Sequence, residues 1–545
     1  MSEPHRRARR GALLSAVGGG LLLAAATPPA WVPGAEFLVV PGLMMWFSLA
    51  TTAVRPYRDS YLLGCVHMAF FSWSLQHLMW AAYLLVVVLG GLYFVLGTAM
   101  VRAVPKRCAA VAFAVAVAAS FWLRAVMPEI YYPHGQPCHC LWQWPALLGA
   151  VSLGGEVFAN ALLAALAAAL LGIWRSWRSG VPRWGAAVTT LAAVGALVTA
   201  ATVGGWWVHA AHAPALPERL SIAAVEPGIH PSDPYEGLPR AEQWPRFREL
   251  FAERLLQPTR ELLASNPALD LVLWPESSVP EDLASEDVEA GRARVLPHWL
   301  PASTTRLLAG GNLRRDGRVT PAAWLVALPD GRVLGHQEKR LLVPGGEFVP
   351  MLAWLPAALG RIMHDVFEQA LGGSAPDCVP GRQLPPLRTA GGVPFGVLLC
   401  YDNAFPGPGE EQVAAGARCL CALSNEAWFR GGDELVQLAA MTVCRALELA
   451  TPVVRCTTDG WSLAVDAEGR LLAWLPMAPT PTPAARILRV ELPLGAGRVP
   501  PLAWLRAAAG PAAALLLALT LLHAAFRWAR LRVARTARPT AGGTD

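Results

Sequence analysis

The amino-acid sequence predicts a multi-span α-helical membrane domain joined to an α/β domain. Hydrophobic residues make up 54% of the 545 residues, a larger share than a soluble protein of this length usually carries. The excess is uneven, because residues 11–208 and 507–526 are mostly apolar whereas residues 215–497 have the composition of a soluble domain. Within that middle region, short apolar runs alternate with amphipathic segments, which is typical of a buried sheet covered by helices.

Eight apolar segments are predicted as transmembrane helices, because a span needs roughly 20 apolar residues. They are residues 11–28, 36–53, 60–78, 80–101, 108–126, 146–173, 185–208 and 507–526. The second and third are the weakest of the eight. The first seven form a predicted membrane domain over residues 1–210, and the eighth follows the α/β domain. A cleaved signal peptide is the alternative for the first segment, where a double arginine precedes a short apolar run.

Basic residues in the loops predict the orientation of these helices. The formal net charge of +6 does not by itself indicate a nucleic-acid-binding protein, because much of the basic excess lies beside the predicted spans. Basic loops alternate with loops that carry fewer positive charges, and they lie at residues 1–10, 55–59, 102–107, 175–183 and 527–538. The positive-inside rule therefore places both termini in the cytoplasm, including a basic tail at 527–545. The domain at residues 218–497 is then expected outside the cytoplasm.

One cysteine cluster is compatible either with a metal site or with a loop that carries free or paired thiols. Cys138 and Cys140 flank His139, and thiols and imidazoles are metal ligands. No second ligand pair at the spacing of a zinc finger accompanies them. We therefore predict no metal, and interpret the segment as a loop with free or paired thiols.

The α/β domain is expected to contain nine short strands and two helical segments. The strands are predicted at residues 220–225, 269–274, 306–311, 322–328, 393–400, 419–424, 452–458, 462–465 and 485–492, and the helices at 241–265 and 434–450. Residues 211–218 and 494–502 are expected to link this domain to the membrane.

Three residues at the ends of apolar runs form a candidate catalytic group. The chain has only two lysines among 45 Lys and Arg residues, so the lysine at 339 indicates a need for an amine there. Glu276 precedes it after LVLWP, and Cys400 follows it after FGVLL. A thiol can attack a carbonyl while a carboxylate moves the proton and an ammonium stabilises the oxyanion. An ammonium beside a thiol also lowers its pKa, so we expect an activated Cys400. Each residue alone also fits an ordinary structural role.

Longer motifs resemble a known family. The sequences WPES, EK…LVPGGEFVP, LLCYD, SNEAWF and RALE…PVVR…TTDG are similar to those of the nitrilase (carbon–nitrogen hydrolase) superfamily. With spans on both sides, the chain resembles the integral-membrane branch of that superfamily, the apolipoprotein N-acyltransferases. The match covers about residues 218–492, and the membrane half matches mainly in layout.

The resemblance implies a fold and a set of roles. It implies an αββα sandwich for the α/β domain, with Glu276 as general base, Lys339 as oxyanion stabiliser and Cys400 as nucleophile. It also implies supporting roles for Glu347, Tyr401 and Asp402. The chain departs from the branch in having VEPGIHPSDPY after its first strand, Asp402 where Glu is usual, and Arg430 where glycine is common. These departures bear on acceptor recognition more than on the thiol chemistry.

Aromatic residues and one amphipathic segment are predicted near the substrates. Tyr235 is interpreted as replacing an acceptor-site tryptophan, and Trp354 and Trp428 are further candidates for substrate binding. Residues 351–371 carry apolar side chains at helical spacing. This segment is expected either to lie on the bilayer surface over acyl chains or to be an ordinary core-facing helix.

By this resemblance the expected function is acyl transfer without a cofactor. A fatty acyl group would pass from a membrane phospholipid, through a thioester on Cys400, to the α-amine of the N-terminal cysteine of a diacylated lipoprotein. The expected location is the bacterial inner (plasma) membrane, with the catalytic domain on the periplasmic side. One alternative is a membrane-tethered amidase of the same superfamily. The other is an inactive membrane scaffold, which the presence of Glu276, Lys339 and Cys400 argues against.

Overall fold

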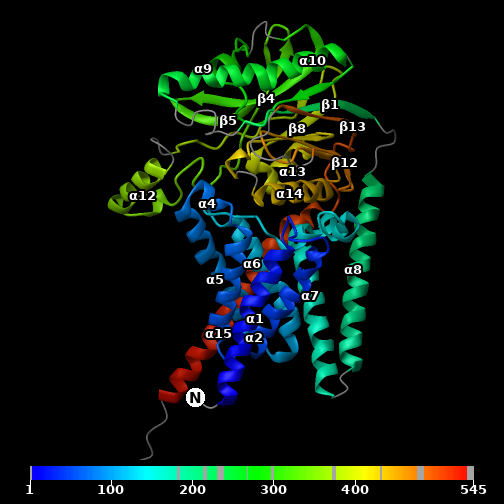
Figure 1. Cartoon of the computed structure of the whole chain (residues 1–545). Coiled ribbons are helices and arrows are strands. Elements are labelled where there is room, and N and C mark those ends of the chain that lie inside the picture. The colour runs from blue at the N-terminus through cyan, green and yellow to red at the C-terminus, as the bar shows by residue number, and fades with distance from the viewer. Residues whose placement is uncertain are drawn as a thin grey trace, which may run out of the picture.

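A bundle of long helices carries a two-sheet domain at one end (Figure 1). The computed structural model describes residues 3–180, 184–212, 218–229, 238–266, 268–295, 300–370, 376–429, 432–475 and 484–536. The last helix returns from the two-sheet domain and packs against the helices at residues 109–126 and 149–179.

Every predicted span is helical in the structure. The long helices are α1 (Glu3–Ala26), α2 (Val39–Thr52), α3 (Pro56–Phe71), α5 (Trp80–Ala103), α6 (Ala109–Val126), α7 (Gly149–Ser179), α8 (Trp184–His212) and α15 (Ala503–Thr536). The short helix α4 (Leu75–Leu78) separates α3 from α5, at the boundary between the third and fourth predicted spans.

Within the described residues, six helical segments are long and apolar enough to cross a membrane, so the protein is a membrane protein. One of them, Ala35–Thr52, consists of a 3₁₀ turn at Ala35–Leu38 followed by α2. The helices α1 and α3 lie outside that group. With 16 residues, α3 is roughly 24 Å long, which is less than the hydrocarbon core of about 30 Å. Eight membrane crossings therefore stay a prediction.

Two mixed sheets make up the α/β domain. The first runs β13 (Arg486–Pro493), β1 (Arg219–Glu226), β2 (Leu271–Leu273), β4 (Ser303–Arg315), β5 (Arg318–Leu328) and β6 (Val333–Glu338), and β3 (Asp282–Ala284) pairs with β4. The second runs β12 (Leu471–Trp474), β11 (Leu463–Val465), β10 (Val453–Thr457), β9 (Leu420–Ser424), β8 (Pro394–Leu399) and β7 (Leu387–Arg388). In the centre of each sheet three strands are parallel: β1, β2 and β4 in one, and β8, β9 and β10 in the other.

The two sheets pack face to face and are covered by helices on both outer faces. Side chains from β1 and β2, such as Ile222 and Leu273, share one buried cluster with Val397 of β8 and Leu423 of β9. The first sheet is covered by α9 (Arg240–Phe251), a π-helical turn at Ala252–Leu256 and α10 (Gln257–Ser265). The second is covered by α13 (Pro406–Ala414) and α14 (Glu434–Leu449). These four layers confirm the expected αββα sandwich.

Helix α14 lies between the second sheet and the membrane helices. All of its residues are buried. Its Ala439 and Val443 share a cluster with Leu420 of β9 on one side and with Val151 of α7 on the other. The Ser152 hydroxyl also donates to the Leu447 carbonyl at 3.1 Å. The α/β domain is therefore seated on the membrane domain through a continuous apolar layer.

Four short strands were not predicted from the sequence: β3, β6, β7 and β12. Strand β6 was not predicted, because VLGHQE has no continuous apolar run. It forms because it pairs with β5, which is apolar. The segment at 351–371 contains helix α12 (Ala357–Ala370), and a small helix α11 (Ser285–Glu289) follows β3.

The predicted orientation can be tested with Cys108, which is the one exposed cysteine among the ten, all of which are described. It follows Lys106 and Arg107, so the positive-inside rule places it in the cytoplasm. A membrane-impermeant maleimide should label Cys108 in inverted vesicles and leave it unlabelled in intact spheroplasts. Ala290→Cys, at an exposed site of the α/β domain in a Cys108→Ser background, should show the opposite pattern. Labelling of both cysteines from one side would contradict this topology.

Candidate active site

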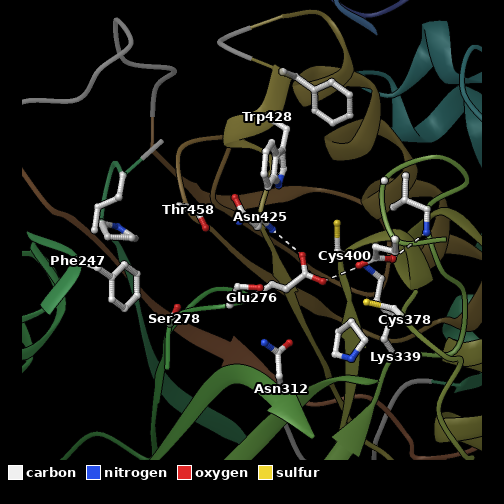
Figure 2. A pocket seen from close by; sticks show the side chains of 18 of the residues that line it. Phe247, Glu276, Ser278, Asn312, Lys339, Cys378, Cys400, Asn425, Trp428 and Thr458 are labelled. Atoms are coloured by element: carbon white, nitrogen blue, oxygen red, sulfur yellow. Dashed lines mark hydrogen bonds and ion pairs between the residues drawn. The ribbon is translucent and has the colours of Figure 1, made fainter. Parts of the chain in front are cut away.

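Strand ends from both sheets meet around one cavity. Glu276 lies just after β2, Lys339 directly follows β6, and Cys400 directly follows β8. All three line a cavity of about 420 Å³, and Figure 2 shows their side chains directed toward one another. Two of these strands, β2 and β8, belong to the parallel cores of the two sheets. Because the carboxyl ends of parallel strands lie at the same edge of a sheet, the sandwich brings the predicted trio together.

Lys339 is a fully buried ammonium held between two carboxylates. Its Nζ lies 2.9 Å from Glu276 Oε1 and 2.6 Å from Glu347 Oε1. The other oxygen of Glu347 accepts from the backbone N–H of Val343 at 2.8 Å. Burial would lower the pKa of Lys339, but the thiol and the two carboxylates outweigh it and raise that pKa well above its ordinary value. Lys339 therefore stays charged.

Glu276 is fixed by its backbone as well as by the ion pair. Its Oε2 accepts from the backbone N–H of Asn425 at 3.1 Å, directly after β9. The next residue, Ser277, has a positive φ of 56°, so the chain turns sharply after the carboxylate. Gly310 of β4 passes so close that a Cβ there would lie 2.4 Å from the Pro275 carbonyl oxygen. A glycine is thus required beside Glu276.

Cys400 occupies a strained turn. Its φ is 47°, an unusual conformation for a non-glycine residue, and it begins a 3₁₀ turn over Cys400–Ala404. Such a sharp turn after a strand presents the side chain at the edge of the sheet. Strain of this kind persists only when the surrounding structure holds it in place.

The thiol is not activated at rest, which corrects the expected lowering of its pKa. Burial and the Glu276 carboxylate raise the pKa of Cys400 to about 12, and Lys339 only partly offsets them. Glu347 raises it further. The sequence suggested an ammonium beside a thiol, whereas the structure places two carboxylates and one ammonium there. A thiol in this setting needs a base that takes its proton during the attack.

Tyr401 and Asp402 support the site from behind rather than lining it. The Asp402 carboxylate accepts from the backbone N–H groups of Leu341, at 2.8 Å, and Arg340, at 3.1 Å. It thereby joins the nucleophile turn to the loop that follows Lys339. Burial raises the pKa of Asp402 to about 7, and these backbone donors oppose that rise. Tyr401 donates to the Tyr131 carbonyl at 3.1 Å, which ties the same turn to the membrane domain.

The walls of the cavity are mostly apolar. They include Leu78 from α4, Phe247 and Phe251 from α9, and Trp428 and Phe429 from the 3₁₀ turn at Ala427–Phe429. Besides Glu276, Lys339 and Glu347, uncharged polar side chains also line the cavity, and Figure 2 shows Ser278, Asn312, Asn425 and Thr458 among them. Leu78 comes from the membrane half of the chain, so both domains build the cavity.

The three predicted substrate-binding aromatics have different outcomes. Trp428 lines the cavity. Trp354 is exposed, is not among the lining residues, and donates to Glu129 at 3.1 Å, so it anchors its loop to the membrane domain. Tyr235 lies outside the described residues, as does Arg430.

Helix α12 keeps much of its apolar face uncovered. Leu359, Ile362 and Val366 are exposed, whereas Phe367 packs with Met79 beside α5. Figure 1 shows α12 at the side of the α/β domain, near α4. A core-facing role therefore accounts for only part of this helix.

Some site residues were missed because their roles depend on neighbours that are remote in sequence. Asn425 belongs to the SNEAWF motif but was not predicted as a site residue. Its position directly after the predicted strand at 419–424 is the sequence signal that could have identified it. Gly310 and Leu78 carry no chemical signal in the sequence. Their importance arises from close approach and from packing between domains.

Gly310→Ala should destabilise the site. The added Cβ would press on the Pro275 carbonyl and on the Cα of Glu276, 2.5 Å away, so the backbone must move. We expect a loss of about 1–3 kcal/mol in the free energy of unfolding, with displacement of Glu276 and a lower rate of Cys400 acylation. Gly407→Ala is the matched control, because no atom lies within 4 Å of its added Cβ. Equal melting temperature and acylation rate in the two variants would refute the close-approach argument.

Comparisons with known proteins agree with this architecture. Residues 221–482 match the carbon–nitrogen hydrolase family. The chain is 31% identical over 256 residues to a Geobacter metallireducens protein named apolipoprotein N-acyltransferase, covering 46% of this chain and 45% of that one. It is 28% identical over 501 residues to a Gloeobacter violaceus protein of the same name, covering 86% of each.

Six further curated relatives are matched over 220 to 333 residues. The match covers 38% to 58% of the relative's length, so the chain spans about half of most relatives that it matches. Among solved structures, an amidase from Nesterenkonia sp. is 22% identical at a TM-score of 0.32, covering 51% of this chain and 92% of that one. The sequence matches show that residues 221–482 form a carbon–nitrogen hydrolase domain, and that the relatives which this chain resembles are named apolipoprotein N-acyltransferases.

Proposed function

We propose that this protein is an N-acyltransferase of the bacterial inner membrane. It moves a fatty acyl group from a membrane phospholipid to the α-amine of the N-terminal cysteine of a diacylated lipoprotein. The single observation that carries the proposal is the cavity, in which a thiol, an ammonium and two carboxylates meet beside Leu78 of the membrane domain. Two membrane-anchored substrates can reach such a cavity without leaving the bilayer.

The lining supports a lipid as acyl donor. Leu78, Phe247, Phe251, Trp428 and Phe429 offer an apolar wall, and only a few polar groups stand near the thiol. Apolar walls with a few convergent polar groups suit a ligand that is mostly hydrocarbon and reacts at one ester. The exposed apolar residues of α12, beside the start of α5, extend this surface toward the bilayer.

In the first half-reaction Cys400 attacks the ester carbonyl of the phospholipid. Because burial and Glu276 raise the pKa of Cys400 to about 12, the thiol is protonated near neutral pH. Glu276 therefore takes the thiol proton as the sulfur–carbon bond forms. The carbon–oxygen bond of the ester then breaks, and the lysophospholipid leaves as an alcohol with the proton from Glu276. The product is a thioester on Cys400.

Lys339 stabilises the oxyanion that forms between these steps. An ammonium has three N–H donors, and two of them bind Glu276 and Glu347. Protonation of Glu276 weakens the first of these ion pairs at the moment when negative charge appears on the substrate oxygen. The Lys339 ammonium then interacts less with Glu276 and more with the oxyanion.

In the second half-reaction the amine of the lipoprotein attacks the thioester. Glu276 accepts a proton from the attacking nitrogen and returns it to the departing sulfur. An amide forms and the free thiol is restored. If water replaced the amine, the same residues would perform hydrolysis, which is the reaction of the amidase alternative.

The acyl-enzyme tests the proposal directly. Purified full-length protein mixed with phospholipid should gain the mass of one fatty acyl group on Cys400, measured by mass spectrometry of the peptides. Addition of a diacylated peptide with an N-terminal cysteine should remove this mass and transfer it to the peptide amine. Cys400→Ala should form no adduct, whereas Cys378→Ala, which changes another thiol in the cavity wall, should still form it.

Each alternative predicts a different result. An amidase would release free fatty acid at the same rate with and without the acceptor peptide. An inactive scaffold would form no adduct in the wild type. Either result, obtained with folded wild-type protein, would overturn the proposed acyl transfer.

The raised thiol pKa predicts how acylation depends on pH. In the wild type, the rate of thioester formation should stay nearly constant over about pH 7 to 9, because Glu276 takes the proton within the step. In Glu276→Gln the rate should fall by about 10²–10⁴-fold at pH 7. The remaining rate should rise about tenfold per pH unit, because the thiolate fraction rises tenfold per unit below the thiol pKa.

The measurement is single-turnover acylation in phospholipid micelles, quenched and followed by mass spectrometry. Glu281→Gln, which changes an exposed carboxylate nearby, is the matched control and should behave as wild type. A tenfold rise per pH unit in the wild type itself would mean that hydroxide forms the thiolate, and that Glu276 is not the base.

A further inference from the structure

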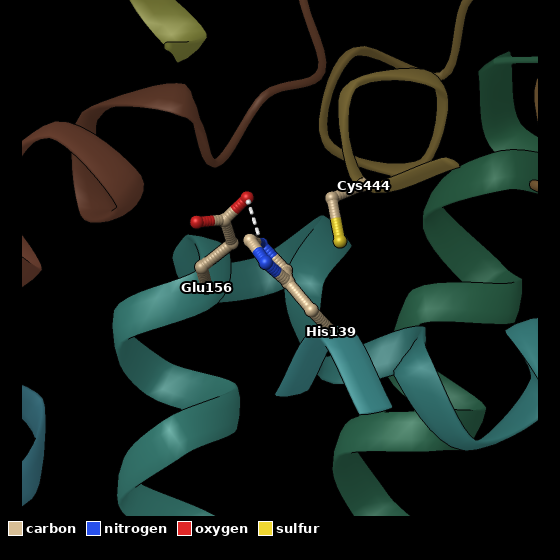
Figure 3. Close-up of side chains that lie close together, drawn as sticks. All are labelled: His139, Glu156 and Cys444. Atoms are coloured by element: carbon tan, nitrogen blue, oxygen red, sulfur yellow. Dashed lines mark ion pairs between the residues drawn. The ribbon is translucent and has the colours of Figure 1, made fainter. Parts of the chain in front are cut away.

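A second group of reactive side chains lies where the α/β domain meets the membrane domain. His139 comes from a 3₁₀ turn at Pro137–Leu141, Glu156 from α7 and Cys444 from α14. One ligand atom from each lies within 4.8 Å of the others, and His139 Nε2 is 3.1 Å from Glu156 Oε1. Figure 3 shows the three side chains directed toward a common point. None of them lines the cavity around Cys400.

These side chains are buried and incompletely satisfied. His139 and Cys444 are fully buried, and the Glu156 side chain is 13% exposed. Within the described part of the chain, neither ring nitrogen of His139 makes a hydrogen bond, and its Nε2 faces the Glu156 carboxylate. An unpaired polar group in such a place is costly unless it binds something. The observation points to a ligand that accepts an imidazole, a carboxylate and a thiol together.

A divalent transition metal has this preference. Zinc is bound in proteins by thiolate, imidazole and carboxylate, with bonds of about 2.3 Å to sulfur and about 2.0 Å to nitrogen or oxygen. Two ligands at about 2.0 Å from a tetrahedral ion are roughly 3.3 Å apart. The separation of 3.1 Å between His139 Nε2 and Glu156 Oε1 is close to that edge.

We propose that His139, Glu156 and Cys444 bind one zinc ion that links the membrane domain to the α/β domain. The thiol of Cys444 is deprotonated on binding, and its proton passes to solvent. Cys444 and Glu156 then balance the charge of the ion, and no electron transfer is involved. The sequence predicted no metal because it lacks a second ligand pair at the spacing of a zinc finger. The structure instead supplies Glu156 from α7 and Cys444 from α14.

The surroundings hold the ligands in place as the outer groups of a metal site do. Arg445 donates to the same oxygen of Glu156 at 2.5 Å and pairs with Glu448 at 2.8 Å, so its charge is balanced. The backbone N–H of Cys138 donates to Asn160 at 2.9 Å, which fixes the turn that carries His139. Hydrogen bonds of this kind orient metal ligands and tune their affinity.

The position of the site indicates its role. Helix α14 also carries Thr442, which accepts from Asn403 in the nucleophile turn at 2.9 Å. An ion that joins α14 to α7 and to the 137–141 turn therefore holds the turn of Cys400 at a defined position over the membrane helices. The role is structural, and it does not depend on which acyl acceptor the enzyme uses.

Metal content tests the proposal. Full-length protein with a tag that contains no histidine is incubated with zinc sulfate in detergent, desalted and analysed by inductively coupled plasma mass spectrometry. We expect about one zinc per chain in the wild type. Cys444→Ser and His139→Gln should each lose it. Cys140→Ser, on the same turn, and His364→Ala, in the exposed group of His364, Asp365 and Glu368, are matched controls that should retain it.

Two further measurements cover variants that fold poorly. Removal of zinc from the wild type by a chelator should lower its melting temperature, and added zinc should restore it. Cobalt substituted into the wild type should show the thiolate-to-cobalt charge-transfer band, because Cys444 is a ligand.

Three results would overturn the proposal. The first is a wild type that retains no zinc, and the second is equal zinc in wild type and in folded Cys444→Ser. The third concerns Cys138, whose thiol lies beside that of Cys444: a Cys138–Cys444 disulfide in the peptide map of the wild type would consume the thiolate ligand.

Discussion

The buried ammonium of Lys339 is the interaction on which the site depends. It lies fully out of contact with water, 2.6 Å from Glu347 and 2.9 Å from Glu276. A single buried charge would cost several kcal/mol of stability, so neither carboxylate nor ammonium is stable there alone. Together they hold the loop after β6 against the strand end of β2. The same three charges set the protonation state of Cys400, because the two carboxylates and burial outweigh the one ammonium.

Burial and the two carboxylates, which outweigh the one ammonium, keep the Cys400 thiol protonated in the free protein. A preformed thiolate in the cavity would be repelled by Glu276 and Glu347, so the thiol stays neutral until a carbonyl arrives. In the mechanism proposed here, proton transfer to Glu276 removes one negative charge and leaves Lys339 to interact with the oxyanion. The positive φ of Cys400 and the close approach of Gly310 to Glu276 hold these groups in place before the substrate binds. Preorganisation of this kind means that little reorganisation is needed during reaction.

The membrane domain takes part in the site as well as anchoring it. Leu78 forms part of the cavity wall, and the loop before the 3₁₀ turn at Pro137–Leu141 contributes Tyr131, whose hydroxyl donates to the Leu342 carbonyl at 2.5 Å. Helix α14 packs against α7 through the apolar cluster that also contains the second sheet. Three separate contacts therefore fix the position of the cavity relative to the membrane helices.

Much of the architecture could be predicted because it depends on local pattern. Apolar runs of about 20 residues and the basic loops between them predicted eight helices, and all eight are present. Short apolar runs predicted the central strands, and the strand ends located Glu276 and Cys400, while Lys339 was conspicuous in a chain with only two lysines. These features are properties of neighbouring residues, so one sequence is sufficient to recognise them.

Properties that arise between remote residues were decided only by the tertiary structure. The sequence could not show that two carboxylates surround Lys339 in a buried cavity. The sequence therefore predicted a lowered pKa for Cys400, whereas burial and Glu276 raise that pKa to about 12. Asn425, Gly310 and Leu78 gained their roles from contacts across the sandwich and across the domain boundary. Likewise His139 meets Glu156 of α7 and Cys444 of α14 only after folding, whereas its neighbours in sequence, Cys138 and Cys140, lie outside that group. The reason is the same in each case: desolvation and electrostatic interaction depend on distance in space, which a linear sequence does not contain.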